Sequence, residues 1–492
     1  MPRWLNALPL AALLVYAVLP TKNYYWDGVD FALNIEQAGG FHSLAFWPSL
    51  IRPNHLIYNL LGYLVWSAVQ GVGLHLRALY VLQAISMVAA VACLWLMQRI
   101  LFKQTASAYI AATLTGICAC SAIFWKYSTD ADAYIPSVLF LIAAFYALTA
   151  SPRPRPIAVG LLHCGAMLIH QLAAFFFPAA ALAIFLQGGW KSLSRYCLMA
   201  VGITLPAYYA GFRLQRREAQ QSFINWLTSH SPDSSFTFNL PRDLAITISS
   251  YARLFFGGTA HLLQFFGPFM LITLVLLAIV LARLIVLIVR YRSDFRLFTP
   301  GAPKDRQLFR IALVWFASYF VFLLFWLPQN TFYKLFCLPA ILVIAAHYSS
   351  QYSGPRRHRL VLLVAAMALA NLALYIYPYS RPDYNQSLRF AMRMGPLWSD
   401  RTVVYYRINT VDNWFIRYFN PETSWKVLDP AENASAFVDS AQRDTASGRD
   451  VWVDITAGEF LAGNGIAVTD FRDAQEDNFQ KHPIRFMRWA PH

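Results

Sequence analysis

The stretch that decides the fold reads LNALPLAALLVYAVLPTKNYYWDGVDF and runs from Leu5 to Phe31. From Leu5 to Leu19 it is apolar apart from Asn6, which predicts a membrane helix. Two carboxylates, Asp27 and Asp30, follow where the chain would leave the bilayer. Acidic side chains beside hydrocarbon are costly, so they indicate a functional site unless they cap a short helix and face water. The rest of the chain decides between these interpretations.

The composition indicates a membrane protein with many spans. The chain has 492 residues, of which 58% are hydrophobic and 13% charged, about half the charged share of a soluble domain. The net charge of +15 would suit nucleic acid, but the basic residues lie in short loops between apolar runs. That arrangement is typical of membrane topology and of attraction to anionic lipid, so no nucleic-acid partner is expected. The six cysteines are dispersed without metal-ligand spacing and are expected to be buried apolar side chains.

We expect about eleven membrane spans of roughly 20 residues each. They are Leu5–Leu19, Leu79–Leu96, Ala106–Phe124, Tyr134–Ala150, Ile157–Ile169, Leu172–Leu186, Tyr196–Phe212, Phe265–Val289, Ile311–Leu327, Leu335–His347 and Leu360–Tyr377. The fifth and sixth meet at His170-Gln171 and could form one kinked helix. No small-x-small cleavage site follows Leu19, so the first helix is expected to be retained.

Lysines and arginines predict the orientation. With the N-terminus inside, every expected inner loop carries basic residues, such as Arg99 with Lys103 and Arg153 with Arg155. The opposite orientation would break the positive-inside rule. We therefore expect the N-terminus inside and the C-terminus outside.

Two expected external segments are unusually long. The first, from Pro20 to about Arg77, contains the apolar stretch LIYNLLGYLVW from Leu56 to Trp66. A crossing there would reverse every later loop, so we expect a helix lying in the membrane interface. The second, from Arg213 to about Leu263, is longer than a connection needs and suggests a lid or binding element.

The last part of the chain is rich in charge and has no span. Residues 402–406 and 450–455 read as buried strands, residues 425–428 as a weaker strand, and residues 430–447 as an amphipathic helix. Alternating strands and helices favour a parallel sheet. The sequence therefore predicts an all-α polytopic membrane domain over residues 1–379 and a small α/β extracytoplasmic domain over residues 380–492.

Five groups of polar or ionisable residues fall at the expected outer ends of the spans. They are Asp27 with Asp30, Arg52 with His55, Lys126 with Asp130 and Asp132, His170, and Asn330 with Tyr333 and Lys334. A carboxylate can act as general base on an acceptor hydroxyl. Lysine and arginine can hold a phosphate leaving group. The pattern therefore suits transfer of a group from a lipid phosphate.

Each group also has a plainer interpretation. Lys126 could place its charge among lipid headgroups, His170 could be a hydrogen-bonded residue between helices, and Lys334 could be an ordinary flanking charge.

The ordered set of motifs resembles the GT-C glycosyltransferases, which include protein O-mannosyltransferases and the aminoarabinose transferase of lipid A. Asp27-Gly28-Val29-Asp30-Phe31-Ala32 matches their acidic motif after the first span. The segment from Arg52 to Gly62 resembles their His-Pro-rich segment, although the proline after His55 is missing. Asp132-Ala133-Tyr134 matches a second acidic motif, with Asp where Glu is more usual. The segments His170 to Pro178 and Trp326 to Lys334 also fit, so the resemblance covers about Leu5 to Tyr377.

This resemblance implies a fold and an activity. It implies an inverting glycosyltransferase of the bacterial inner membrane that takes a sugar from a polyprenyl-phosphate carrier at the outer face. The acceptor, whether glycan, lipid or protein, stays open.

The resemblance also assigns roles to residues. Asp27 would be the catalytic base, and Asp30 and Asp132 would orient the acceptor or a metal. Lys126, Arg52 and the cluster Arg213–Arg217 would stabilise the phosphate, with His55, Asp130, His170, Tyr333 and Lys334 as further substrate-binding residues. A divalent metal is neither required nor excluded, because members of the class differ and no ligand set is visible.

Two other classes of function stay open from the sequence. A transporter or flippase of lipid-linked intermediates would favour charged residues in mid-span and internal repeats, which are nearly absent here. A membrane sensor without catalysis would use the α/β domain as a receptor and the acidic residues as helix caps. Loss of lipid-linked sugar turnover on changing Asp27 would distinguish an enzyme from both.

Overall fold

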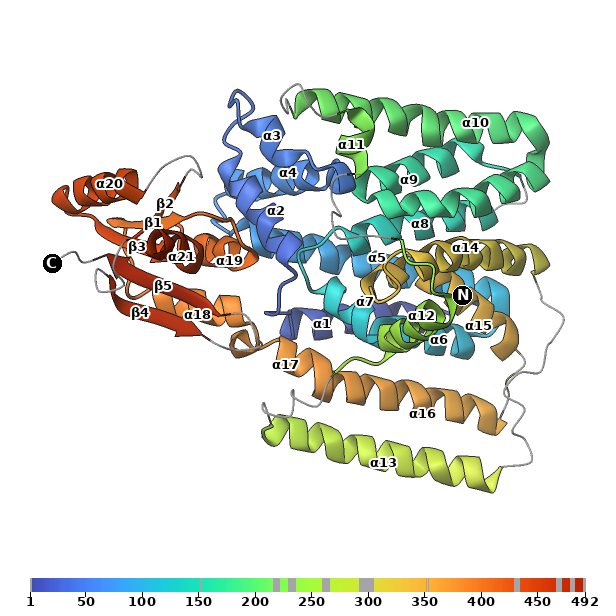
Figure 1. The fold of residues 1–492 in the computed structure, drawn as a ribbon. Coiled ribbons are helices and arrows are strands. Elements are labelled where there is room, and N and C mark those ends of the chain that lie inside the picture. Colours follow the sequence, from blue (N-terminus) through green and yellow to red (C-terminus); the bar gives the residue numbers. More distant parts are fainter. Residues whose placement is uncertain are drawn as a thin grey trace. The chain divides into compact units, whose positions relative to one another are not determined.

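The computed structural model describes residues 2–150, 153–215, 222–228, 236–258, 266–291, 305–350, 352, 354–428, 434–465, 471–477 and 483–489. The chain forms two compact units (Figure 1). One contains Met1–Thr21 and Asn34–Ser380, and the other contains Lys22–Leu33 and Arg381–His492. Helix α2 (Trp26–Gln37) belongs to the second unit up to Leu33. Each unit is described by itself.

The first unit is helical and carries the apolar segments. Its α-helices are α1 (Ala7–Val18), α3 (Phe46–Leu50), α4 (Tyr58–Gly71), α5 (Ala78–Thr105), α6 (Ala108–Cys120), α7 (Ala122–Ser128), α8 (Tyr134–Thr149), α9 (Pro156–Ile169), α10 (Phe177–Leu214), α11 (Phe223–Thr228), α12 (Leu240–Phe255), α13 (Pro268–Arg290), α14 (Arg306–Phe325), α15 (Leu338–Ser349), α16 (Gly354–Asn371) and α17 (Tyr377–Tyr379). Shorter turns are η1 (Arg3–Asn6), η2 (Pro53–His55), η3 (Gln171–Phe176), η6 (Phe332–Cys337) and the π-helical η7 (Leu372–Ile376).

Within the described residues, six helices are long and apolar enough to cross a membrane, or seven if the pair α6 and α7, bent by 67°, is one span. Three shorter apolar helices, Arg3–Val18, α8 and α9, accompany them. Gly189, at φ 64°, breaks α10 into two helices, because this left-handed conformation suits glycine and costs other residues. The expected polytopic membrane fold is thus confirmed, and each of the eleven expected segments is helical.

Close backbone approach holds α9 against α10. A Cβ atom on Gly160 would lie 2.6 Å from Cβ of Met199 and 2.9 Å from the Tyr196 carbonyl oxygen. Small residues of this kind allow membrane helices to pack closely. One turn further, Nδ1 of His163 lies 2.7 Å from the Tyr196 hydroxyl and Nε2 lies 2.9 Å from the Ala173 carbonyl oxygen. This buried histidine therefore braces two helices.

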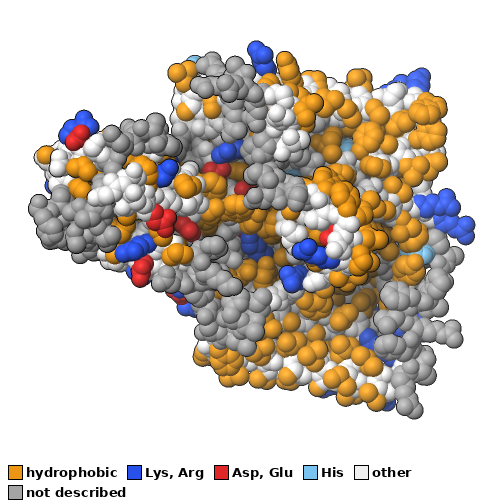
Figure 2. All heavy atoms as spheres, in the orientation of Figure 1, with side chains coloured by type: hydrophobic (Ala, Val, Ile, Leu, Met, Phe, Trp, Pro, Cys, Tyr) orange, Lys and Arg blue, Asp and Glu red, His pale blue; other side chains and the backbone are white. Residues whose placement is uncertain are grey.

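Helix α13 presents most of its apolar surface outward. Only 6% of its most apolar stretch of 18 residues is buried inside the protein. Hydrophobic side chains such as Leu271, Ile279 and Val286 are exposed on the helix. Figure 2 shows the hydrophobic cover of this helix, which packs alongside α16. Such a surface indicates contact with lipid.

The second unit is built on a five-stranded sheet in the order β2-β1-β3-β5-β4. Its remaining elements are η8 (Pro382–Tyr384), α18 (Gln386–Met394), β1 (Thr402–Tyr406), α19 (Val411–Phe419), β2 (Ser424–Val427), α20 (Ala434–Ala446), β3 (Asp450–Asp454), α21 (Ile455–Gly463), β4 (Phe471–Asp477) and β5 (Ile484–Trp489). Strands β2, β1 and β3 are parallel, with Val403 opposite both Ser424 and Val451. The expectation of a parallel sheet is wrong for the other strands, since β5 is antiparallel to both β3 and β4.

Alternating residues of the central strands fill two cores. Val403 and Val451 pack with Phe437 of α20 and Leu461 of α21. On the opposite face, Val404 and Trp452 pack with residues of α18 and α19, among them Phe390 and Ile416. Because neighbouring strand residues point to opposite faces, both faces of β1 and β3 are covered. The unit is therefore a three-layer α/β/α domain.

Candidate functional site

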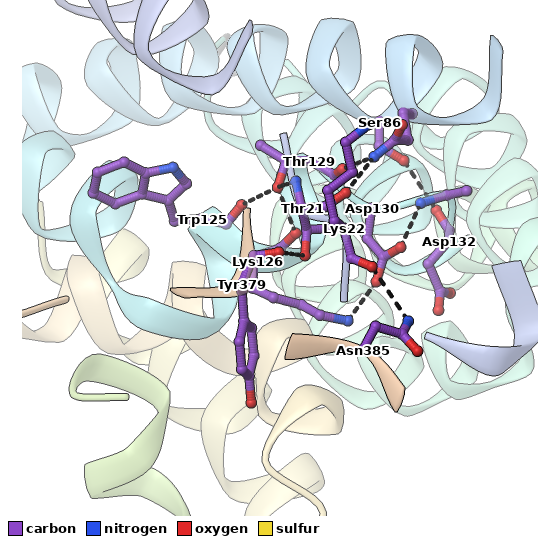
Figure 3. Close-up of polar contacts among 12 residues, drawn as sticks. Thr21, Lys22, Ser86, Trp125, Lys126, Thr129, Asp130, Asp132, Tyr379 and Asn385 are labelled. Atoms are coloured by element: carbon purple, nitrogen blue, oxygen red, sulfur yellow. Dashed lines mark hydrogen bonds and ion pairs between the residues drawn. The ribbon is translucent and has the colours of Figure 1, made fainter. Parts of the chain in front are cut away.

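A buried ion pair lies at the turn between α7 and α8. Ser121 ends α6 with an extended backbone (φ −63°, ψ 137°), and α7 then leaves in a new direction. Lys126 on α7 forms an ion pair with Asp130, four residues later, and both side chains are nearly inaccessible to solvent (Figure 3). A buried charge is tolerated when it is paired. The two residues therefore depend on each other.

Three polar residues fasten the segment that carries this pair. Gln83 of α5 donates through Nε2 to the carbonyl oxygens of Thr21 (3.1 Å) and Thr129 (2.6 Å). The Thr21 backbone N–H donates to Oγ1 of Thr129 at 3.2 Å. These contacts (Figure 3) join the end of α1, one face of α5 and the turn after α7. The position of Lys126 is thereby fixed by long-range contacts.

Asp132 lies in the same turn and is fully buried. Its Oδ1 accepts a hydrogen bond from the Ala133 backbone N–H at 2.6 Å, and its carbonyl oxygen accepts one from the Ser86 hydroxyl at 3.3 Å. Burial raises the pKa of the Tyr58 hydroxyl well above its usual value, and the charges of Asp132 and Asp130 raise it further. Tyr58 therefore lies close to both carboxylates and stays protonated.

An aromatic cluster brings together residues from distant parts of the sequence. The rings of His55 and His170 lie 4.6 Å apart, centroid to centroid, and Tyr134 lies 5.0 Å from His170. Tyr333 of η6 lies 6.0 Å from Tyr134 and 6.2 Å from His170. Tyr134 immediately follows the Asp132 turn. The structure thus brings four of the sequence-predicted segments to one place in the first unit.

The cationic side chains that the sequence predicted for the site differ in how deeply they are buried. Arg52 precedes η2 and is half-buried. Lys334 is fully buried, and its ammonium group donates to the carbonyl oxygens of Pro328 (2.8 Å) and Asn330 (3.0 Å). Arg213 is exposed on the last turn of α10, and Arg217 lies outside the described residues.

The acidic motif after the first span belongs to the second unit, and Glu36, a few residues later, belongs to the first. Asp27 and Asp30 lie half-buried on the part of α2 that belongs to the second unit. There Trp26 stacks on Trp414 of α19, with ring centroids 6.3 Å apart. Glu36, in the first unit, accepts hydrogen bonds from Nε of Arg77 at 3.0 Å and from the Ala78 backbone N–H at 2.7 Å. It therefore braces the start of α5.

Several residues of the site escaped the sequence analysis. Gln83 and Ser86 hold the Asp132 turn through hydrogen bonds to the carbonyl oxygens of Thr129 and Asp132. Tyr134, which the second acidic motif contained without a role, stands at the centre of the aromatic cluster. The available signal was two polar residues one turn apart, Gln83 and Ser86, inside an apolar span. Among the described residues, no three His, Cys, Asp or Glu side chains are grouped as metal ligands would be.

Solved structures share this fold along the whole chain. ArnT from Cupriavidus metallidurans bound to undecaprenyl phosphate superimposes with a TM-score of 0.60 at 10% sequence identity, over 99% of this chain and 98% of that one. ArnT from the same organism in the apo state gives a TM-score of 0.61 at 11% identity, over 99% and 97% of the two chains. No protein-family model and no curated protein sequence matches the chain. The expected fold, a polytopic helical membrane domain with a small C-terminal α/β domain, is confirmed, and these ArnT structures share it.

Proposed function

We propose that this chain is a glycosyltransferase that moves a sugar from a polyprenyl-phosphate carrier to an acceptor outside the cytoplasm. The observation that carries the proposal is the full-length ArnT fold, one example of which is bound to undecaprenyl phosphate. The buried group of Lys126, Asp130 and Asp132, next to the cluster of His55, His170 and Tyr333, supports it. The orientation with the N-terminus inside rests on the basic loops, and the inner-membrane location rests on the resemblance.

The proposed reaction is a single inverting displacement. The acceptor hydroxyl oxygen attacks the anomeric carbon, and its proton passes to the Asp27 carboxylate. The bond from the anomeric carbon to the phosphate oxygen breaks, and its electron pair stays on the phosphate. A carboxylate suits the base role, and cations that are already in place suit the charge that develops on the phosphate.

Lys126 is the proposed principal phosphate ligand. Its ion pair with Asp130 gives the ammonium group a partner of opposite charge inside the protein, where an unpaired charge would be costly. Arg52 and Tyr333 are proposed to complete the phosphate site, and His55 and His170 to contact the sugar. Arg213 and Arg217 are proposed to attract the anionic carrier from the membrane surface. Asp30 and Asp132 are proposed to orient the acceptor.

The decisive variant is Asp27→Asn, which keeps the size of the side chain but removes the base. In a strain that lacks the protein, polyprenyl-phosphate sugar is expected to accumulate, as measured by mass spectrometry of the lipid extract. Wild-type chain should restore its consumption, and Asp27→Asn should reduce the rate by about 10²–10⁴-fold.

The matched control is Asp383→Asn, an exposed aspartate of the same unit. It should restore consumption fully. Near-normal turnover by Asp27→Asn together with loss of turnover by Asp132→Asn would move the base role to Asp132. A strain without any accumulated lipid-linked sugar would speak against the whole proposal.

A further inference from the structure

Two glutamine side chains hold the backbone on either side of Arg52. Gln171 stands at the start of η3, and Gln215 directly follows α10. The segment between them in space is Ile51 to His55, which carries two of the proposed substrate-binding residues. Gln171 lies in the segment His170 to Pro178 and Gln215 in the cluster Arg213–Arg217, but the sequence assigned no role to either glutamine.

Gln171 fixes the downstream side of this segment. Its Nε2 donates to the Pro53 carbonyl oxygen at 2.9 Å and to the Leu227 carbonyl oxygen at 3.1 Å. One amide therefore joins the Arg52 turn to α11, which is separated from it by more than a hundred residues of sequence. The adjacent residue His170 contributes to the aromatic cluster with His55.

Gln215 fixes the upstream side. Its Nε2 donates to the Ile51 carbonyl oxygen at 3.2 Å, and its Oε1 accepts a hydrogen bond from the Trp226 indole N–H. Trp226 is fully buried among Ile51, Leu56 and Tyr208. A Cβ atom on Gly211 would lie 2.5 Å from Cδ1 of Leu56. Tight packing therefore leaves this backbone little room to move.

We propose that Gln171 and Gln215 are positioning residues, which fix the Arg52–His55 segment for binding of the carrier phosphate and which make α11 part of that binding site. The inference rests on the proposed function. An arginine binds phosphate through a planar fork of N–H groups. Its contribution to phosphate affinity therefore depends on the position of its backbone. Displacement by about 1 Å is enough to cost on the order of 10²-fold in a reaction that depends on alignment.

The test measures binding of undecaprenyl phosphate to the purified full-length protein, from the rise of its thermal transition with lipid concentration. Gln171→Met and Gln215→Met keep the length of each side chain but remove its hydrogen bonds. Each should raise the Kd for undecaprenyl phosphate by about 10–100-fold. In an Arg52→Gln background the same substitutions should have little further effect, because both act through one segment.

The matched control is Gln98→Met. Gln98 is fully buried and, like the two glutamines, donates to a backbone carbonyl oxygen, that of Leu5 at 2.8 Å. It lies about 22 Å further along α5 than Gln83. This variant should lower the thermal transition of the lipid-free protein to a similar extent and leave the Kd for undecaprenyl phosphate unchanged.

Two results would overturn the inference, and they differ. If wild type binds undecaprenyl phosphate and both glutamine variants bind as Gln98→Met does, the positioning role is wrong and the proposed function stands. The same conclusion follows if the glutamine substitutions raise the Kd as much in the Arg52→Gln background as they do in wild type. If wild type itself shows no response to undecaprenyl phosphate, the carrier part of the proposed function falls, and the positioning role falls with it.

Discussion

At the scale of single residues, the ion pair of Lys126 and Asp130 has two separable consequences. Both side chains are nearly inaccessible to solvent. Removing either one leaves an uncompensated buried charge, which typically costs about 3–5 kcal/mol. A loss of activity in a single variant would therefore mix lost stability with lost chemistry.

A double variant separates the two effects. Lys126→Met alone should destabilise the protein, and Lys126→Met combined with Asp130→Leu should recover most of that loss, because no charge is left buried. Carrier turnover should stay low in both, since the phosphate has lost its cation. Thermal unfolding and steady-state kinetics on the same preparations measure the two properties.

The opposite pattern would change the assignment. If the double variant regains both stability and normal kinetics, Lys126 is a structural residue. Arg52, Arg213 and Arg217 would then be the remaining candidates for the phosphate ligand.

The sequence pointed to the charged residues of this region, but not to the glutamines that hold the surrounding backbone. Lys126, Asp130 and Asp132 attract attention because charges at the end of an apolar span are costly. Gln83 and Gln171 do not, since their function lies in hydrogen bonds to carbonyl oxygens far away in the sequence. Local pattern contains no information about such partners. Glu36 illustrates the reverse case, in which an acid near the motif supports a neighbouring helix.

At the scale of elements, the crossing of α9 and α10 depends on one glycine. Gly160→Val should force the helices apart, because its side chain would meet the Tyr196 backbone and Cβ of Met199. Overpacking of this kind costs about 1–3 kcal/mol. It should also weaken the contact of His163 with Tyr196.

Gly202→Val, on the other helix of the pair, α10, is the matched control, since Gly202 is exposed and its nearest neighbour is a Leu198 methyl group. Thermal unfolding in lipid nanodiscs should show a clear loss for the first variant and little change for the second. Equal losses would show that the crossing does not depend on close approach at Gly160.

The parallel strands of the sheet were predictable from the sequence, and the antiparallel strands β4 and β5 were not. The apolar runs of β1 and β3 identify buried parallel strands. The sequences of β4 (FRDAQED) and β5 (IRFMRW) mix charges into the pattern, and β4 lies at the edge of the sheet, where charges help to avoid aggregation. Their antiparallel pairing therefore became visible only in the structure.

At the scale of the whole molecule, the proposal requires one orientation. Reporter fusions after Arg155, Arg296 and Arg357 should report the cytoplasm, because basic residues gather in these loops. A fusion after Asp400 should report the opposite side. A C-terminal unit found in the cytoplasm would separate it from the lipid-linked sugars that the proposal assigns to the outer face.

Hydrophobic patterning was enough to locate the expected apolar segments, but not to decide which of them join into one membrane span. The break at Gly189 and the bend at Ser121 set which segments count as one span, and both depend on backbone geometry. The grouping of residues 22–33 with the C-terminal unit depends on contacts such as Trp26 on Trp414. Contacts between residues so far apart in the chain cannot be predicted from local sequence patterns.

The outward-facing surface of α13 has a practical consequence for biochemical work. A helix with so little of its surface against protein is retained mainly by the surrounding bilayer. Detergents with short chains replace that bilayer poorly, whereas nanodiscs or native lipid patches preserve lateral pressure around the helix. Preparations in lipid are therefore the appropriate material for the binding and unfolding measurements described above.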